Sequence, residues 1–272
     1  MIRSKGFSLV ELAVALAIIA LLIAGALIPL STQMDVRNVA DTRRTMESIR
    51  EAIIGFAQAN GRLPCPADGT VAAGAAGAGT EQVVGTTCAG AGGSVFFGVV
   101  PWATLGVPEV DGWGRRFSYW VSPIFADGLP PTVNTWSSVG QSPTCAPTPT
   151  PIQSSFALCS QGVITVNTRN ESTHAPTALG SQLPAVIISH GKNGSGAYTP
   201  AGSILPAPAG ADETSNQTHA NTVTTFYSRI PTPAASSCND GAVGTFCEFD
   251  DIVVMITSNN LIARMVAAGK LP

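Results

Sequence analysis

The sequence predicts an α+β protein in which a long N-terminal helix precedes a large head rich in strands and loops. Residues 12–30 contain nineteen consecutive residues without a charge, and residues 31–60 continue with apolar side chains at helical spacing. Beyond residue 61, short β-rich runs alternate with stretches of glycine, proline and alanine. The chain holds 28 glycines and 20 prolines in 272 residues, which argues against a long helical bundle.

The overall composition excludes two further classes of protein. Charged residues make up only 11% of the chain and the formal net charge is -3, whereas general nucleic-acid binders carry a concentrated basic excess. Hydrophobic residues make up 45%, which is enough to bury a core and argues against a disordered chain.

The apolar run at residues 12–30 predicts a membrane anchor. A helix of about 20 apolar residues spans a bilayer core of about 30 Å. Arg3 and Lys5 precede the run, so the positive-inside rule keeps the N-terminus in the cytoplasm and exports the rest. A cleaved secretory signal is the alternative, but the run is long for one and no small-x-small site closes it.

Glu11 lies at the very start of this apolar segment. An ionisable group costs roughly 2.5–3.5 kcal/mol at the centre of a membrane helix, less near its end, and suggests a function. No cation lies one helical turn downstream. A cut after Gly6 would create an ammonium group at Phe7, and a neighbouring copy could then supply that charge to Glu11.

Residues 5–12, Lys-Gly-Phe-Ser-Leu-Val-Glu-Leu, resemble the class III signal of type IV pilins and type II secretion pseudopilins. In that family a membrane aspartyl peptidase, the prepilin peptidase, cuts after the glycine and N-methylates the new terminus. The resemblance therefore implies a leader at residues 1–6, cleavage between Gly6 and Phe7, and methylation of Phe7. It also implies an assembly role for Glu11 in a transmembrane and assembly helix at residues 7–30.

Residues 31–60 predict an amphipathic continuation of the helix. Its apolar face consists of Val39, Met46, Ile49, Ile53 and Phe56. Asn60 followed by Gly61 is a typical helix end. Pro29 should kink or locally melt the helix.

Residues 61–272 predict a globular head on the exported side. Strands are expected at residues 117–121, 162–166, 186–189, 223–227 and 252–257. The low-complexity stretches at 72–79, 143–151 and 206–210 predict surface loops. A final helix should begin at Ser258 or Asn259 and close at Gly269.

Three head segments are similar to the pattern of major pseudopilins: residues 111–119, 188–194 and 250–253. The resemblance implies a pilin-like fold, with the helix packed on an antiparallel β-sheet. It also raises the question of Ca²⁺, with Asn193, Asp250 and Asp251 as candidate ligands. The alternative is that Asp250 caps a turn and Asn193-Gly194 forms a tight one. No other cofactor is expected.

All six cysteines lie on the exported side, where disulfides form. Six cysteines allow fifteen connectivities. We favour sequential pairing because each pair then brackets one loop-rich segment: Cys65–Cys88, Cys145–Cys159 and Cys238–Cys247. Zinc is the competing interpretation, but the sequence has no CxxC pair.

The sequence offers little support for catalysis. Ser189 and His190 are adjacent and so poorly placed as nucleophile and base, and no G-x-S-x-G motif is present. Residues 115–120 mix charge and aromatic rings, which could contact single-stranded DNA. A buried aromatic strand is the preferred interpretation of this segment, and nucleic acid is not an expected partner.

We therefore expect a non-enzymatic filament subunit, a pilin or pseudopilin of a type IV pilus or type II secretion system. The implied partners are the prepilin peptidase, other pilin subunits, the inner membrane and its assembly platform. The chain would start in the inner membrane with its head in the periplasm, and end in the filament. The alternatives are a minor pilin, whose head primes assembly or binds a surface, a secreted substrate or DNA, and a membrane-tethered periplasmic enzyme.

Overall fold

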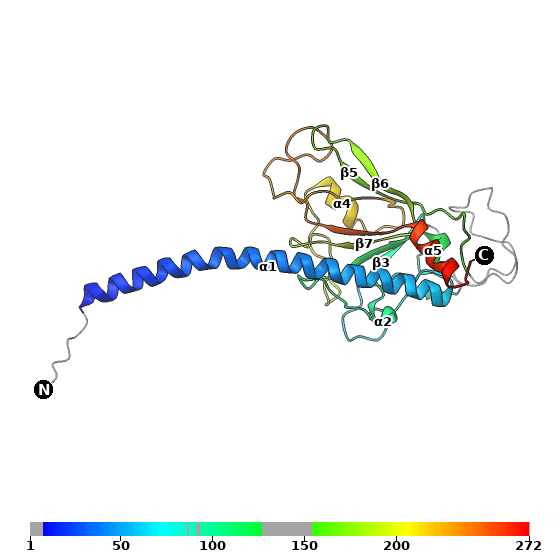
Figure 1. The fold of residues 1–272 in the computed structure, drawn as a ribbon, viewed down its shortest axis with the longest axis horizontal. Helices are drawn as coiled ribbons and strands as arrows, with labels where there is room; N and C mark the ends of the chain where they lie inside the picture. The colour runs from blue at the N-terminus through cyan, green and yellow to red at the C-terminus, as the bar shows by residue number, and fades with distance from the viewer. Residues whose placement is uncertain (1–7, 86, 91–92, 127–153, 272) are drawn as a thin grey trace.

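The computed structural model describes residues 8–85, 87–90, 93–126 and 154–271, and only the backbone of residues 22–32. One helix, α1 (Leu9–Asn60), projects far beyond a globular head (Figure 1). Its 52 residues correspond to about 78 Å. The described chain is therefore α+β, as predicted.

Helix α1 ends where the sequence predicts but does not break where expected. Gly61 takes the left-handed conformation with φ of 72°, and its N–H donates to the carbonyl oxygen of Ala57. The helix continues through Pro29, so the expected local melting is wrong. A proline removes one hydrogen bond from the helix, and the remaining bonds of a helix this long keep it continuous.

The head contains two main sheets, a short hairpin and four short helices among the described residues. The four-stranded sheet is antiparallel, in the order β3 (Phe96–Val99), β4 (Ser118–Val121), β7 (Ala185–Ser189) and β9 (Ile252–Ile256). The three-stranded sheet has the order β6 (Pro176–Leu183), β5 (Ile164–Arg169) and β8 (Thr225–Tyr227). The hairpin pairs β1 (Val83–Val84) with β2 (Thr87–Cys88), and the helices are α2 (Trp102–Leu105), α3 (Pro123–Ala126), α4 (Ala211–Gln217) and α5 (Ser258–Ala267).

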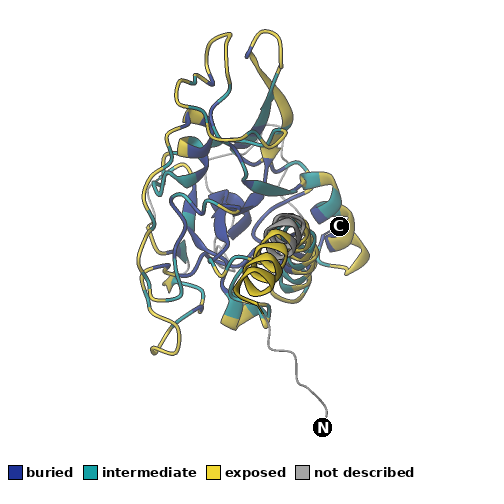
Figure 2. Ribbon diagram, turned by 90° about the vertical axis from the view of Figure 1, so that its left-hand side faces the viewer, coloured by how far each residue is buried: buried dark blue, intermediate teal, exposed yellow. Residues whose placement is uncertain are grey.

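The head is built in layers, with the four-stranded sheet in the middle. Met46, Ile49 and Ile53 of α1 are fully buried in the core between the helix and that sheet. A second core, which includes Trp120 and Phe226, lies between the two main sheets. Figure 2 shows the contrast between this buried interior and the exposed helix that leaves it.

The structure contains every strand that the sequence predicts. All five are present to within three residues, and the last helix begins at Ser258. The short strands β1, β2 and β3 and the longer β6 were not predicted. The sequence of β6, PTALGSQL, lacks β-branched pairs, and seven of its eight residues are not buried. The sequence predicts an antiparallel sheet in the head, but the head also contains one parallel pair of strands, β5 with β8.

A buried arginine ties three long loops of the head together. Arg116 is fully buried, and one terminal nitrogen donates to the carbonyl oxygens of Gly69 and Val71 at 2.8 Å. The other donates to the carbonyl oxygen of Pro200 and to Glu109. The guanidinium therefore satisfies loop carbonyls that belong to neither of the main sheets.

Candidate functional site

The first described turn of α1 forms a capping box. The backbone N–H of Ser8 donates to Glu11 Oε2 at 3.0 Å, and the N–H of Glu11 donates to Ser8 Oγ at 3.2 Å. Glu11 thus has a partner one turn upstream within its own chain. The Ser-x-x-Glu spacing is the known sequence signature of this cap, so the contact between Ser8 and Glu11 could have been predicted from the sequence. The predicted cleavage residues Gly6 and Phe7 lie outside the described residues.

The N-terminal part of α1 projects away from the described part of the head (Figure 1). Its large apolar side chains are exposed, from 87% for Leu9 to 50% for Ile19. Among the residues that the structure describes, no helix is long and apolar enough to cross a membrane.

Three carboxylates gather where α4 meets the segment before β9. Ligand atoms of Glu213, Asp250 and Asp251 all lie within 4.8 Å of one another. The backbone N–H of Asp250 donates to Glu213 Oε1, and Asn216 donates to Asp251 Oδ2. The second oxygens of Asp250 and Asp251 are buried without a hydrogen-bond partner among the described residues.

The electrostatics of this acidic cluster favour neutralisation by a proton or a cation. Burial raises the pKa of Glu213 to about 8, and the nearby Asp251 adds to the rise. Burial also raises the pKa of Asp250 to about 6, partly offset by the Asn193 N–H that donates to it. Oxygen-rich clusters of this kind suit hard cations such as Ca²⁺.

The structure brings Asn193 to the cluster. Its side-chain nitrogen donates to both oxygens of Glu213, and its side-chain oxygen accepts from the N–H of Ser195. Its amide therefore positions Glu213, and its role as a Ca²⁺ ligand stays a prediction. Glu213 itself was missed, because no sequence pattern links α4 to Asp250, 37 residues away.

A serine, a histidine and an aspartate line up across the middle sheet. Ser118 Oγ lies 2.8 Å from His190 Nε2, and His190 Nδ1 lies 3.7 Å from Asp251 Oδ1. Ser118 and His190 are fully buried, so this row is closed to any substrate in the present conformation. His190 pairs with Ser118 and not with its neighbour Ser189, which instead donates to Asp111.

The predicted disulfides Cys65–Cys88 and Cys238–Cys247 are both present. Cys159 is also disulfide-bonded, while its predicted partner Cys145 lies outside the described residues. None of the described cysteines is free.

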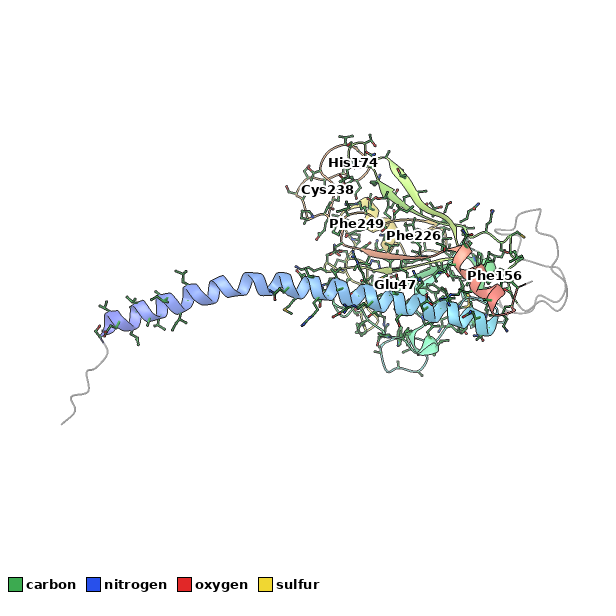
Figure 3. All side chains as sticks on the ribbon, viewed as in Figure 1. Glu47, Phe156, His174, Phe226, Cys238 and Phe249 are labelled. Atoms are coloured by element: carbon green, nitrogen blue, oxygen red, sulfur yellow. A yellow bond between two sulfur atoms is a disulfide. The ribbon has the colours of Figure 1, made fainter. Side chains whose placement is uncertain are left out.

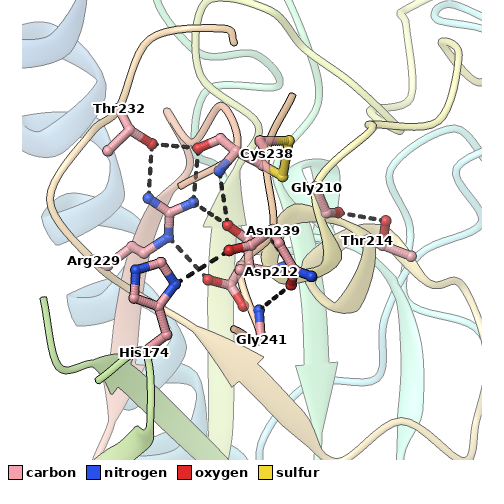
Figure 4. Close-up of a disulfide and its surroundings, with 11 residues drawn as sticks. His174, Gly210, Asp212, Thr214, Arg229, Thr232, Cys238, Asn239 and Gly241 are labelled. Carbon is pink, nitrogen blue, oxygen red and sulfur yellow. Dashed lines mark hydrogen bonds and ion pairs between the residues drawn. A yellow bond between two sulfur atoms is a disulfide. The ribbon is translucent and has the colours of Figure 1, made fainter. Parts of the chain in front are cut away.

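The Cys238–Cys247 bridge closes a loop that a buried ion-pair network holds in place (Figure 4). Arg229 contacts Asp212 at 2.9 Å and Asp240 at 3.0 Å, and Arg169 binds the other side of Asp212. His174 adds a contact from its ring nitrogen to the carbonyl oxygen of Asn239. Figure 3 places Cys238 and His174 at the edge of the head, away from Glu47 on α1.

The aromatic segment at residues 115–120 is interior. Arg116 and Trp120 are fully buried, and the Arg115 guanidinium donates to the carbonyl oxygens of Gly191 and Lys192. The segment therefore forms a buried strand, as preferred, and presents no stacking surface for DNA.

Comparison with known families adds one finding. Residues 1–27 match the family described as the prokaryotic N-terminal methylation motif. Comparison with curated proteins and with solved structures gave no match. The matched region includes the segment at residues 5–12 and the capping box of Ser8 and Glu11. It confirms that the chain carries the N-terminal signature of the type IV pilin and pseudopilin family.

Proposed function

We propose that this protein is a structural filament subunit, a pilin or pseudopilin of a type IV pilus or type II secretion system. The prepilin peptidase would cut between Gly6 and Phe7 and methylate Phe7. The processed chain would wait in the inner membrane with its head in the periplasm. The assembly platform would then move it into a filament with other subunits.

The observation that carries this proposal is the exposed apolar stretch of α1 from Leu9 to Leu21, which lies within the methylation motif. Exposed apolar surface on this scale is unstable in water, at about 25 cal/mol for each Å². The lipid bilayer would cover it first, and the same surface of neighbouring helices would cover it in the filament.

Intact-mass spectrometry of protein from native membranes and sheared filaments tests the processing step. We expect the loss of residues 1–6 and the addition of one methyl group at Phe7. Cleavage removes Arg3 and Lys5, which changes the formal charge from -3 to 12 − 17 = -5. Gly6→Leu is the matched control that should keep its leader. Assembled filaments made of uncut chains would refute the proposal.

A specialised minor subunit is the second candidate, and the disulfide-closed loop at residues 238–247 favours it. This loop is largely exposed at its tip yet anchored by buried ion pairs at its base. Rigidly held polar loops are common recognition surfaces. Quantitative mass spectrometry of purified filaments separates the two roles, because a minor subunit should be present at a small fraction of the main subunit.

We also propose that Ca²⁺ binds the acidic cluster of Glu213, Asp250 and Asp251. The partnerless oxygens of Asp250 and Asp251 support this fit, and an ion there would offset the mutual repulsion of the three carboxylates. Calorimetric titration of the calcium-free protein with Ca²⁺ tests it, with Asp251→Asn as the weakened variant. Equal Ca²⁺ affinity of both proteins would exclude the cluster as the site.

A further inference from the structure

A groove of about 800 Å³ runs between α1 and the start of β9. One wall is a stripe of α1 residues spaced four apart, and the other is formed by residues 228–233 and 248–254. We call it the acidic groove because its charged lining residues are Asp35, Arg43, Glu47, Lys192, Arg229, Glu248, Asp250 and Asp251.

The acidic groove has more carboxylates than available cations. Lys192 already pairs with Asp35 at 2.7 Å, and Arg229 is held by carboxylates outside the groove. Arg43 is then the one lining cation without an ion pair among the described residues, against the carboxylates of Glu47, Glu248, Asp250 and Asp251. Glu248 has no ion pair among the described residues, and Glu47 is 51% exposed although it contacts Arg50. Even with Ca²⁺ on the acidic cluster, Glu47 and Glu248 would still attract a cation.

The acidic groove also contains an unused hydrogen-bond acceptor. Asp251 lines it with a side chain that is 1% exposed. Its Oδ1 lies 3.7 Å from His190 Nδ1 and has no hydrogen-bond partner among the described residues. Buried polar atoms without partners are rare in folded proteins, and this oxygen can accept a hydrogen bond from an arginine, which only donates.

The face of α1 that points away from the head core presents matching cations. Arg37 and Arg44 are seven residues apart, about two turns or roughly 10.5 Å along the axis. Thr42, Met46 and Ile49 pack into the head from the other side of the helix. The Arg44 side chain is 81% exposed and contacts Asp41 only at 3.4 Å, and such a solvent-exposed pair contributes little to stability. Arg37 is exposed and has no ion pair among the described residues.

We infer that Arg37 and Arg44 of one subunit dock into the acidic groove of the next subunit of the same filament. This inference rests on the proposed filament function and adds a specific contact between heads and helices. The two surfaces are different patches on one chain, and contacts between different patches generate rings when the rotation closes and open helical filaments when it does not. Opposite charges at such an interface also fix register and suppress wrong partners.

Cysteine cross-linking in filaments tests the contact directly. We expect Arg44→Cys with Glu248→Cys to form covalent dimers and longer ladders in sheared filaments. The control pair, Arg44→Cys with Leu179→Cys, uses an exposed position on β6 and should remain monomeric. Equal cross-linking of both pairs, or none for the first pair in normal filaments, would overturn the inference.

Charge reversal gives an independent measurement. Arg37→Glu with Arg44→Glu should lower the filament fraction by about tenfold or more, and adding Glu47→Lys with Glu248→Lys should restore most of it. Reversal of Arg264, an exposed arginine of α5, serves as the control and should change little. Normal assembly of the doubly reversed variant would reject the docking while leaving the filament function intact. A wild-type chain that never enters filaments would reject both.

Discussion

The two halves of α1 belong to one continuous helix but differ in burial. Met46, Ile49 and Ile53 are fully buried against the sheet, whereas Leu9 and Leu16 are mostly exposed to solvent. The buried half alternates apolar and charged faces, while residues 12–21 of the exposed half are apolar on every side. The first pattern can be satisfied within the subunit, and we propose that a bilayer or other subunits cover the second.

Removing Glu11, the single carboxylate of the exposed half, is the strongest test of the difference between the two halves of α1. We expect Glu11→Ala to insert in the membrane but to lose more than about tenfold in filament fraction, because it removes the contact that we propose between Glu11 and the Phe7 ammonium of a neighbouring subunit. The measurement is the sheared-filament fraction relative to the membrane fraction.

The capping box supplies the matched control for that experiment. Ser8→Ala removes the cap, worth about 1 kcal/mol, but retains the carboxylate, so it should assemble far better than Glu11→Ala. Asp250→Ala should chiefly lower head stability. If Glu11→Ala assembles normally with processing intact, Glu11 has no part in registry between subunits.

The second prediction compares equivalent truncations in the two halves. Ile53→Ala should lower the free energy of unfolding of the head by about 2–5 kcal/mol, because it leaves a cavity in the core. Leu16→Ala should leave head unfolding unchanged and affect only filament entry. Urea denaturation followed by tryptophan fluorescence measures the first effect. Equal destabilisation by both variants would show that the halves are coupled in the subunit.

The third prediction ranks two disulfides of the head, Cys65–Cys88 and Cys238–Cys247. Loop-closure entropy gives about 3.4 kcal/mol for the bridge of sequence separation 23 and about 2.6 kcal/mol for that of separation 9. Replacing Cys65 and Cys88 by serine should therefore lower the denaturation midpoint more than replacing Cys238 and Cys247. The opposite ranking would assign the 238–247 loop the greater part in holding the head together.

The smallest effect concerns pH and the acidic cluster. Glu213 has a folded pKa of about 8 against 4.5 unfolded, so between these values the folded state holds a proton that the unfolded state has lost. Head stability in EDTA should therefore fall as pH rises from about 5 to about 8. Glu213→Gln should flatten this slope, as measured by urea midpoints. An unchanged slope in Glu213→Gln would assign the pH dependence to another group.

Local patterns of the sequence predicted the features that depend on neighbouring residues. They include the helix end at Gly61, the five β-rich runs and the Ser258 helix start. Long-range features were missed because no local signal encodes them. The approach of Glu213 to Asp250 is one example, and the parallel pairing of β5 with β8 is another. The continuity of α1 through Pro29 depends on the length of the whole helix, which a local breaker rule does not weigh.

The buried Arg116 would allow the loops that it holds to vary in length and sequence. Its guanidinium gathers the carbonyls of Gly69, Val71 and Pro200 in the way a metal ion gathers ligands, so the loops are fixed at their bases. Beyond those bases the chain can lengthen or change sequence without disturbing either sheet. Diversity in such a protein would accumulate at the loop tips, which surround the head, while the tethered bases keep each new surface on the same frame.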